Sequence, residues 1–425
     1  MYNLCIFEDT KYRLFLPLTH LRPAYDLLCG LDTLAGKIIR YIPHDNVILH
    51  CRPYLKDVIK QRHVNALINQ LTTAGSCLFV NGRALISRNL LQDIELTAGK
   101  NYIYLNQQEE LILAYLNGES LTAMKNYLDK GPINCAEVFQ ALRLKALVKK
   151  IDVPTVNYPW ELIAHQGSQL KEDFSSLAIG LLKGDIQTSA CLLNEDQIFI
   201  DKGSKIDAFS VLDASDGPIY ISKNVHILPH SYLKGPVFIG DNCEIRSARI
   251  TASSIGPCCK IGGEVKSTTI LGYSNKAHDG FLGNSYLAEW INLGALTTNS
   301  NLKNNYSQVK VQLDGSLIDT NETFFGSLIG DHTKTGIGTL FNTGIVVGVG
   351  NNLFGGGLFA QKSIPSFSWG TKDELTEYKL EKFIETEKLV MPRRSVELTE
   401  AYKATLKYVF SQTANERLHF MRATT

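Results

Sequence analysis

Short apolar runs alternate with amphipathic stretches from the N-terminus to about position 160. The strand-like runs cover residues 4–7, 46–50 and 77–80. Between them, residues 25–39 and 55–68 place apolar side chains at helical spacing. Short strands separated by helices are typical of a mostly parallel sheet with helices on both faces, and such sheets bind ligands beyond the carboxyl ends of their strands. We therefore predict an α/β domain whose functional loops are residues 8–22 and 81–87.

A different pattern begins near residue 198 and runs to about residue 367. An aliphatic residue followed by glycine recurs here, and six residues separate the members of three aliphatic pairs: Ile239 and Ile245, Ile255 and Ile261, Leu271 and Ala277. A six-residue period is the signature of a parallel β-helix, in which each aliphatic side chain points into the core. An antiparallel sandwich with glycine turns is the alternative, but its period-two alternation is weak here. Successive pairs follow one another at a spacing shorter than three full hexads, so shortened corners or insertions are expected.

Residues 371–425 lose the glycine pattern and show apolar side chains at helical spacing. The spaced residues are Leu398, Ala401, Tyr402, Leu406 and Val409. A break at Pro392 predicts two helices, which we expect to cap the end of the coil. The predicted domains are residues 1–185, 186–370 and 371–425, with a connecting helix after Pro159 at the end of the first.

Composition excludes several classes of function. The 425 residues carry a formal net charge of +1, so charge does not favour binding to nucleic acid or to an anionic membrane. No run reaches the roughly 18 apolar residues of a membrane span, and the N-terminus lacks the pattern of a signal peptide. Nine cysteines without regular spacing indicate neither a disulfide framework nor a zinc site. We therefore expect a cytoplasmic protein.

Polar side chains are concentrated among glycine turns in residues 262–306. The domain order of the whole chain, a sheet domain followed by a hexapeptide coil, resembles that of the bifunctional enzyme that acetylates glucosamine 1-phosphate and uridylylates the product. In that family the coil is left-handed. The phrases at residues 16–23, 301–306 and 364–370 are similar to a branch of sugar nucleotidyltransferases that carry such a coil, and this similarity spans nearly the whole chain. The resemblance implies a Rossmann-like nucleotidyltransferase domain, a left-handed β-helix and a helical tail.

The resemblance also implies a site in the coil. His278 matches the family's general base, Glu264 its partner, and Ala295 the residue whose backbone meets the thioester of acetyl-CoA or another acyl-CoA. The matching substrate-binding residues are Lys266, Asn292, Asn301 and, one position out of register, Arg249. Histidine suits this role because its ordinary pKa near 6.5 lets it take a proton from an amine at neutral pH. The alternative for His278 is a hydrogen-bonded turn residue at a coil corner.

Several positions depart from the family pattern. Phe281 stands where the family has a substrate-contacting tyrosine, which leaves the identity of the sugar open. The glycine-rich phosphate loop is absent, and Gly82 occupies the place of the metal-binding aspartate. Asp9 remains a candidate carboxylate for Mg²⁺, which needs oxygen ligands. The candidates for binding a nucleotide or sugar phosphate are Arg13, Arg22, Lys37 and Arg83, and the alternative for the arginines is a place in surface salt bridges.

These observations lead to three alternative functions. The first is acyl transfer from coenzyme A to a sugar phosphate or nucleotide sugar, with His278 as the base. The second is Mg²⁺-dependent transfer of a nucleotidyl group to a sugar 1-phosphate in the N-terminal domain. The third is a non-catalytic scaffold that binds a sugar nucleotide. The resemblance further implies a homotrimer with sites between neighbouring coils, and no partnership with nucleic acid or membrane.

Overall fold

The computed structural model describes residues 2–177 and 181–424, and the chain divides into two compact units, each described by itself below. The first unit comprises Met1–Phe15, Leu21–Leu27 and Asp32–Tyr158. The second comprises Leu16–His20, Leu28–Leu31 and Pro159–Thr425. Within the described ranges, no helix is both long and apolar enough to cross a lipid bilayer.

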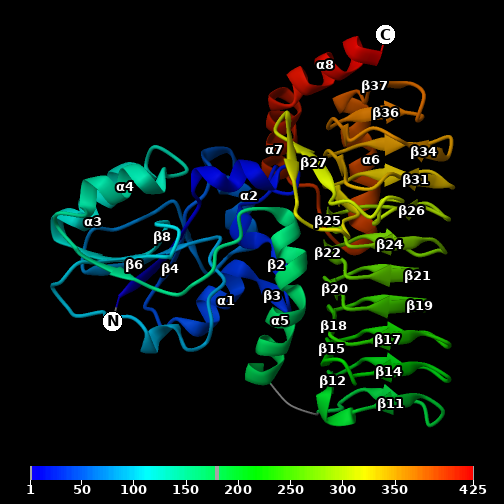
Figure 1. Cartoon of the computed structure of the whole chain (residues 1–425), viewed down its shortest axis with the longest axis horizontal. Coiled ribbons are helices and arrows are strands. Elements are labelled where there is room, and N and C mark those ends of the chain that lie inside the picture. The colour runs from blue at the N-terminus through cyan, green and yellow to red at the C-terminus, as the bar shows by residue number, and fades with distance from the viewer. Residues whose placement is uncertain (1, 178–180, 425) are drawn as a thin grey trace. The chain divides into compact units, whose positions relative to one another are not determined.

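The first unit is built on a mixed sheet with the strand order β5-β4-β1-β6-β8-β7-β9 (Figure 1). In chain order these strands are β1 Asn3–Phe7, β4 Val47–Leu49, β5 Leu67–Ile68, β6 Ser76–Asn81, β7 Tyr102–Leu105, β8 Leu111–Asn117 and β9 Leu147–Lys150. β1 pairs in parallel with β4 on one side and β6 on the other, whereas β8 is antiparallel to both β6 and β7. The α/β prediction is confirmed. The chain runs from β1 to β4 and β5 on one side and then crosses to β6 on the other side of β1. The strand order therefore reverses between β1 and β6, and the expected ligand crevice lies beyond their carboxyl ends.

The helices of this unit differ in part from the prediction. They are α1 Leu34–Tyr41, α2 Lys56–Arg62, α3 Gly118–Leu128 and α4 Cys135–Leu142, with 3₁₀ turns η1 Thr10–Phe15, η2 Ala24–Asp26, η3 Pro53–Leu55 and η4 Leu90–Gln92. The predicted helix over residues 25–39 is wrong in its first half. α1 begins only after Thr33, whose hydroxyl caps it by accepting from the Gly36 N–H at 3.0 Å. The predicted helix over residues 55–68 ends at Arg62, because Leu67 and Ile68 pair with β4 as β5.

The second unit is a stack of coils (Figure 1). Its strands form three faces, and the strands within each face pair in parallel. The first face consists of β12 Ile198–Ile200, β15 Ile219–Ile221, β18 Val237–Ile239, β20 Ser254–Ile255, β22 Thr269–Gly272, β25 Tyr286–Glu289, β29 Ser327–Ile329, β32 Ile345–Val347 and β35 Ser363–Ile364. The second face carries β10 Asp185–Ile186, β13 Lys205–Ile206, β16 His226–Ile227, β23 Asn275–Lys276, β30 Lys334–Thr335, β33 Asn352–Leu353 and β36 Ser368–Gly370. The third carries β11 Cys191–Leu193, β14 Val211–Asp213, β17 Tyr232–Lys234, β24 Phe281–Gly283, β26 Thr298–Asn299, β31 Thr339–Phe341 and β34 Gly357–Phe359. β19 Glu244–Thr251 and β21 Lys260–Lys266 pair with strands of both the second and third faces.

The stacked parallel strands confirm the predicted β-helix. Ile239, Ile245, Ile255 and Ile261 point into the core and are fully buried. Both members of the third predicted pair are wrong by one position, because Ile270 and Lys276, rather than Leu271 and Ala277, stand in register with Ile255 and Ile261. The coil from Ile261 to Lys276 is one position shorter than the coil from Ile245 to Ile261, so the whole pair shifts by one position while its six-residue spacing is kept.

Insertions interrupt the coil, as the irregular spacing predicted. An antiparallel hairpin of β27 Lys310–Leu313 and β28 Ser316–Asp319 lies between β26 and β29. At the far end, β37 Leu375–Glu377 pairs antiparallel with β36. The coils on either side of the hairpin still stack, because Tyr286 and Leu287 of β25 are in register with Leu328 and Ile329 of β29.

Helices and two N-terminal segments complete the second unit. α5 Pro159–Leu177 packs along the first face, where the Thr269 hydroxyl donates to the Gln166 side chain at 2.8 Å. β2 Leu28–Cys29 also belongs here, and the Leu28 carbonyl accepts from the buried Tyr286 hydroxyl at 2.9 Å. After the coil come α6 Leu380–Val390, η6 Met391–Arg394, α7 Glu400–Gln412 and α8 Ala414–Thr424. The break at Pro392 is a 3₁₀ turn, and the described tail holds three α-helices where two were predicted.

Candidate active site

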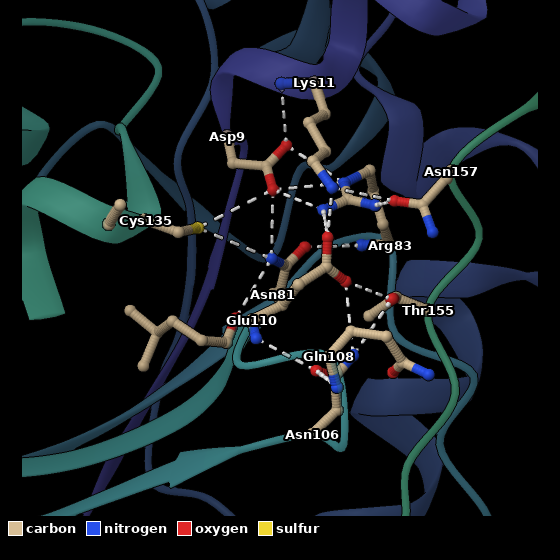
Figure 2. Close-up of polar contacts among 12 residues, drawn as sticks. Asp9, Lys11, Asn81, Arg83, Asn106, Gln108, Glu110, Cys135, Thr155 and Asn157 are labelled. Atoms are coloured by element: carbon tan, nitrogen blue, oxygen red, sulfur yellow. Dashed lines mark hydrogen bonds and ion pairs between the residues drawn. The ribbon is translucent and has the colours of Figure 1, made fainter.

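A buried ion pair occupies the carboxyl edge of the first unit's sheet. Asp9 follows β1 and Arg83 follows β6, and both side chains are almost completely enclosed. Arg83 Nη2 lies 2.7 Å from Asp9 Oδ2, and Arg83 Nε lies 3.0 Å from Oδ1. Figure 2 shows the guanidinium directed at this carboxylate, with the ion pair of Lys11 and Glu110 beside it. The fold therefore brings Asp9 and Arg83 together, but as partners of one another.

A second enclosed ion pair follows the neighbouring strands β1 and β4. Arg52 Nε lies 3.0 Å from Glu8 Oε2, and the Arg52 backbone N–H donates to the same oxygen. Burial raises the pKa of the Glu8 carboxyl, although Arg52 partly offsets this. Arg52 also donates to the Arg22 carbonyl at 2.7 Å. Two charged pairs thus fill the edge at which sheets of this kind bind a ligand.

We tested whether these residues fit a Mg²⁺ ion. Both Asp9 oxygens already accept hydrogen bonds from Arg83, and Asn81 Nδ2 donates to Oδ2 at 3.1 Å. No side chain fits at Gly82, because a Cβ there would lie 2.9 Å from the Tyr25 side chain. Among the residues that the structure describes, no group of three His, Cys, Asp or Glu side chains is placed to hold a metal. Since Mg²⁺ needs several oxygen ligands and displaces water reluctantly, the residues present do not fit it.

The remaining predicted residues of the first unit lie on other elements and differ in exposure. Arg13 is exposed on η1, where its guanidinium lies over the Tyr12 ring. Lys37 is buried on α1, and the Arg22 side chain is buried in a loop.

The candidate base of the coil, His278, lies at a corner between the second and third faces. The corner connects β23 to β24, and the His278 side chain is exposed. Gly280 turns the chain at a φ of +130°, where a Cβ would lie 2.2 Å from the Thr297 carbonyl oxygen. Only glycine fits this position, so the turn that presents His278 depends on it.

Three predicted site residues, the catalytic partner Glu264 and two substrate-binding residues, form an exposed group on the third face. Glu264 and Lys266 are exposed on either side of the buried Val265 in β21. Arg249 on β19 stands in register with Glu264, which in turn stands in register with Phe281 on β24. Among the described residues, the Glu264 carboxylate makes no hydrogen bond with the imidazole of His278. Glu264 and His278 therefore lie on adjacent coils but are not hydrogen-bonded to each other.

Asn301 belongs with this third-face group. Its amide Nδ2 donates to Asn284 Oδ1 at 2.8 Å. A Cβ built on Gly283 would lie 2.4 Å from the Phe281 ring and 2.9 Å from Asn301 Nδ2. The ring and the amide therefore both lie over Gly283. The phenylalanine offers an apolar surface where a tyrosine would have supplied a hydroxyl.

A cavity of about 660 Å³ opens on the other side of the corner, over the second face. His278, Asn292 and Ala295 all line it. Its cationic lining comes from both the coil and the tail: Arg246, Lys260, Lys334, Arg393 and Arg394. No acidic side chain lines it among the described residues. Glu244 pairs with Arg246 and Lys260, and Glu387 pairs with Lys334. Arg393 and Arg394 therefore supply most of the positive charge that favours an anionic ligand.

Contacts between the tail and the coil shape this cavity. Arg394 of η6 donates from Nη2 to Asn275 Oδ1 at 2.7 Å and from Nε to the Cys258 carbonyl at 3.3 Å. Tyr273 stacks on Trp290 at the corner of the first face, with ring centroids 4.4 Å apart. Sequence reasoning missed these residues. The basic pair beside Pro392 is visible in the sequence, but only the folded tail shows that it reaches the coil corner.

The chain shows limited similarity to known proteins. Residues 4–180 match the family described as sugar nucleotidyl transferase. A bifunctional sugar-1-phosphate nucleotidylyltransferase/acetyltransferase of Sulfurisphaera tokodaii is 34% identical over 99 residues, which are 23% of this chain and 25% of the relative. The bifunctional protein GlmU of Methanococcus vannielii is 27% identical over 157 residues, 37% of this chain and 33% of the relative. The chain thus matches only a quarter to a third of the length of these curated relatives.

Two solved structures align with low scores. A CTP:phosphocholine cytidylyltransferase from Streptococcus pneumoniae aligns at 8% identity and a TM-score of 0.25, covering 37% of this chain and 94% of that one. An Arabidopsis UDP-N-acetylglucosamine acyltransferase aligns at 12% identity and a TM-score of 0.20, covering 57% of this chain and 92% of that one.

Proposed function

We propose that this protein is an acyltransferase. Its N-terminal domain matches the sugar nucleotidyl transferase family, and its coil is hexapeptide acyltransferase-like. The chain also has distant similarity to bifunctional enzymes of the GlmU type. It transfers an acyl group from coenzyme A to an amine of a sugar phosphate or nucleotide sugar. The observation that carries the proposal is the place of His278, an exposed imidazole between an anion-binding cavity and a polar strand face.

The donor occupies the cavity over the second face. Its phosphates meet the basic side chains of the coil and of η6, among them Lys260 and Arg394. Across the part of the chain that the structure describes, no hydrogen bond engages the Ala295 N–H, whereas the Ala295 carbonyl accepts from Gly338 at 2.8 Å. That N–H can therefore donate to the thioester carbonyl. Asn292 lines the same cavity and orients the donor.

The acceptor occupies the third face. Arg249 and Lys266 carry positive charge toward its phosphate, and Glu264 and Asn301 supply hydrogen-bonding groups. His278 takes the proton from the acceptor amine as its nitrogen bonds to the thioester carbon. The carbon–sulfur bond then breaks, and the proton passes from the imidazolium to the departing thiolate. The products are the acylated sugar and free coenzyme A.

An assay with a matched variant tests this proposal. The parent protein is incubated with acetyl-CoA and a panel of amino-sugar phosphates and amino nucleotide sugars, with release of free thiol as the readout. His278→Ala should lower kcat by about 10²- to 10⁴-fold, the range for loss of a general base. His230→Ala is the control, because His230 is also an exposed histidine at a coil corner. A parent that acylates none of the acceptors refutes the proposal.

Nucleotidyl transfer is the second candidate, favoured by the family match of residues 4–180. The enclosed pair of Asp9 and Arg83 argues against it, because both oxygens of the Asp9 carboxylate already accept from Arg83 and are not free for a metal–triphosphate complex. We expect no Mg²⁺-dependent release of pyrophosphate from nucleoside triphosphates with sugar 1-phosphates. If the parent releases pyrophosphate and Asp9→Asn abolishes it, nucleotidyl transfer is established. If calorimetry shows binding of a sugar nucleotide without turnover, this domain is a scaffold.

A homotrimer is proposed as the working assembly. Apolar side chains point outward on the third face beyond the site, where Leu340 and Leu358 are in register and 41% and 49% exposed. Burying this row against a second copy of the coil removes apolar surface from water. Sedimentation velocity should report a trimer for the parent and a smaller species for Leu340→Asp with Leu358→Asp. A monomeric parent contradicts the assembly.

A further inference from the structure

One inward-facing position of the second face breaks the pattern of the coils below it. Register places the same core position at four fully buried isoleucines in successive coils: Ile206, Ile227, Ile245 and Ile261. The next coil has Lys276 there, with only 2% of its side chain exposed. A lysine in an aliphatic row loses the apolar contacts of its neighbours and buries a charge, so the position demands a physical explanation.

The ammonium of Lys276 joins two corners of the coil. Nζ donates to the Gly262 carbonyl at 2.9 Å and to the His278 carbonyl at 2.9 Å. Gly262 lies in the corner of the preceding coil, directly after the last isoleucine of the row. Burial lowers the pKa of the Lys276 ammonium to about 8, and the nearby Asp279 opposes this only weakly. The lysine thus holds the backbone of the His278 corner to the corner below.

The His278 corner is longer than the corner on which it stacks. In the preceding coil, three positions lead from Ile261 on the second face to Glu264 on the third. Their register partners, Lys276 and Phe281, are five positions apart, as are Ile206 and Val211 in an earlier coil, so the His278 corner holds two residues more than the corner it stacks on. A longer corner has more backbone freedom, and ordering it costs entropy. Hydrogen bonds from a charged donor to buried carbonyls are among the stronger kinds.

We propose that Lys276 is a positioning residue for His278, holding its corner to the shorter corner of the preceding coil so that the imidazole stays at the junction of the donor cavity and the acceptor face. The inference rests on the proposed function, in which His278 is the base. Lys276 does not touch the substrates, because its side chain lies in the core. Its loss therefore displaces the base while leaving the binding groups of both faces in place.

The test compares Lys276→Met with Ile261→Met, which alters the same core position one coil earlier without removing an ammonium. Lys276→Met should lower kcat by about 10- to 100-fold, the cost of a small displacement of a catalytic group. The KM values for donor and acceptor should stay within about twofold, because substrate binding is unchanged. Hydrogen exchange should be faster at the amides of residues 277–281 in this variant. Ile261→Met should leave both kcat and this exchange unchanged.

The outcomes separate the inference from the proposed function. A parent that acylates no acceptor refutes the proposed function, and the exchange measurement alone then decides the anchor. Unchanged exchange at residues 277–281 overturns the anchor, whether or not acyl transfer is found. Faster exchange with an unchanged kcat, or a raised KM with an unchanged kcat, overturns the positioning role. If Lys276→Met does not fold, Lys276→Ile, which removes the donor and restores the isoleucine of the preceding coils, enters the same comparison.

Discussion

At the scale of single residues, enclosed charges distinguish this chain from an ordinary α/β domain and an ordinary coil. Arg83 and Arg52 each have a carboxylate partner within hydrogen-bonding distance. Among the described residues, Lys276 has only backbone carbonyls within hydrogen-bonding distance. Burying a charge is costly unless hydrogen bonds or an opposite charge offset the loss of water. These residues therefore affect stability as well as the site. A lysine bonded to carbonyls predicts a dependence of stability on pH, whereas an arginine paired with a carboxylate predicts a loss of stability when the arginine is removed.

The buried lysine predicts a dependence of stability on pH. The Lys276 pKa is lowered from 10.5 to about 8 by burial, so below pH 8 the ammonium is charged in both states and its cost is fully present. Between about pH 8 and 10.5 the unfolded chain binds more protons, and stability should rise with pH, by at most about 3 kcal/mol. Urea unfolding of the coil at pH 7 and 10 measures this rise. The rise should be absent in Lys276→Met, and an equal rise in both proteins contradicts the assignment.

The ion pair in the first unit predicts a local loss of stability. Arg83→Met leaves the Asp9 carboxylate buried without its partner, which should cost about 3–5 kcal/mol. The chain's three tryptophans, Trp160, Trp290 and Trp369, all belong to the second unit. Circular dichroism should therefore show an earlier transition, while tryptophan fluorescence reports an unchanged coil. The exposed pair of Lys125 and Asp129 provides the control, since Lys125→Met should change stability by less than about 1 kcal/mol.

At the scale of elements, the register of the stacked strands sets which side chains of the coil lie side by side. The tail helices α6 and α7 contact the coil through one buried polar cluster. Glu387 of α6 accepts from His332 at 2.7 Å and also pairs with Lys334 of β30. The other His332 nitrogen lies 2.9 Å from the Tyr402 hydroxyl of α7. Burial opposes ionisation of Glu387, but His332 and Lys334 hold the pKa of its carboxyl below the ordinary value. Because Lys334 also lines the donor cavity, this cluster links the tail to the proposed site.

Glu387→Gln should detach α6 from the coil. A carboxyl with a lowered pKa stabilises the fold above about pH 4.5, and this contribution is lost as the pH falls below that value. At pH 7 the substitution should cost about 3–5 kcal/mol, and the loss should shrink in acid. Hydrogen exchange in residues 380–390 measures the detachment. Glu385→Gln on the same helix should have almost no effect, because its pair with Lys382 is exposed, and a similar loss from both variants contradicts the prediction.

At the scale of the whole molecule, the second unit includes short segments from the beginning of the chain. The Gly30 carbonyl accepts from the buried Ser254 hydroxyl at 2.9 Å, and the Asp173 carboxylate accepts from the Leu31 N–H at 3.0 Å. The Tyr286 hydroxyl reaches the Leu28 carbonyl. A fragment of residues 159–425 loses these three hydrogen bonds, at about 0.5–1.5 kcal/mol each.

The fragment should therefore melt at a lower temperature than the coil of the full chain. Tryptophan fluorescence compares the two directly, because all three tryptophans are retained in the fragment. Tyr286→Phe in the full chain removes one of the contacts and should lower stability by about 1 kcal/mol. A fragment as stable as the full chain would show that the N-terminal segments do not stabilise the coil.

The sequence by itself determined the two architectures, because periodicity is a local property. Alternating apolar runs predicted the sheet domain, and the six-residue aliphatic period predicted the coil. The absence of a carboxylate at Gly82 was also visible before folding. The period could not assign the exact inward residue once a coil lost one position, which is why Lys276 was missed and Ala277 was placed inward.

Only the tertiary structure decided how the charged groups are paired. Asp9 and Arg83 are 74 residues apart, and their contact arises because β1 and β6 lie side by side. Arg394 reaches Asn275 across 119 residues because the tail folds back over the coil. Whether a basic or acidic side chain binds a ligand or a neighbour depends on which strands share an edge and on how far the corner extends. Neither property can be predicted from the residues that neighbour the charged side chain in the sequence.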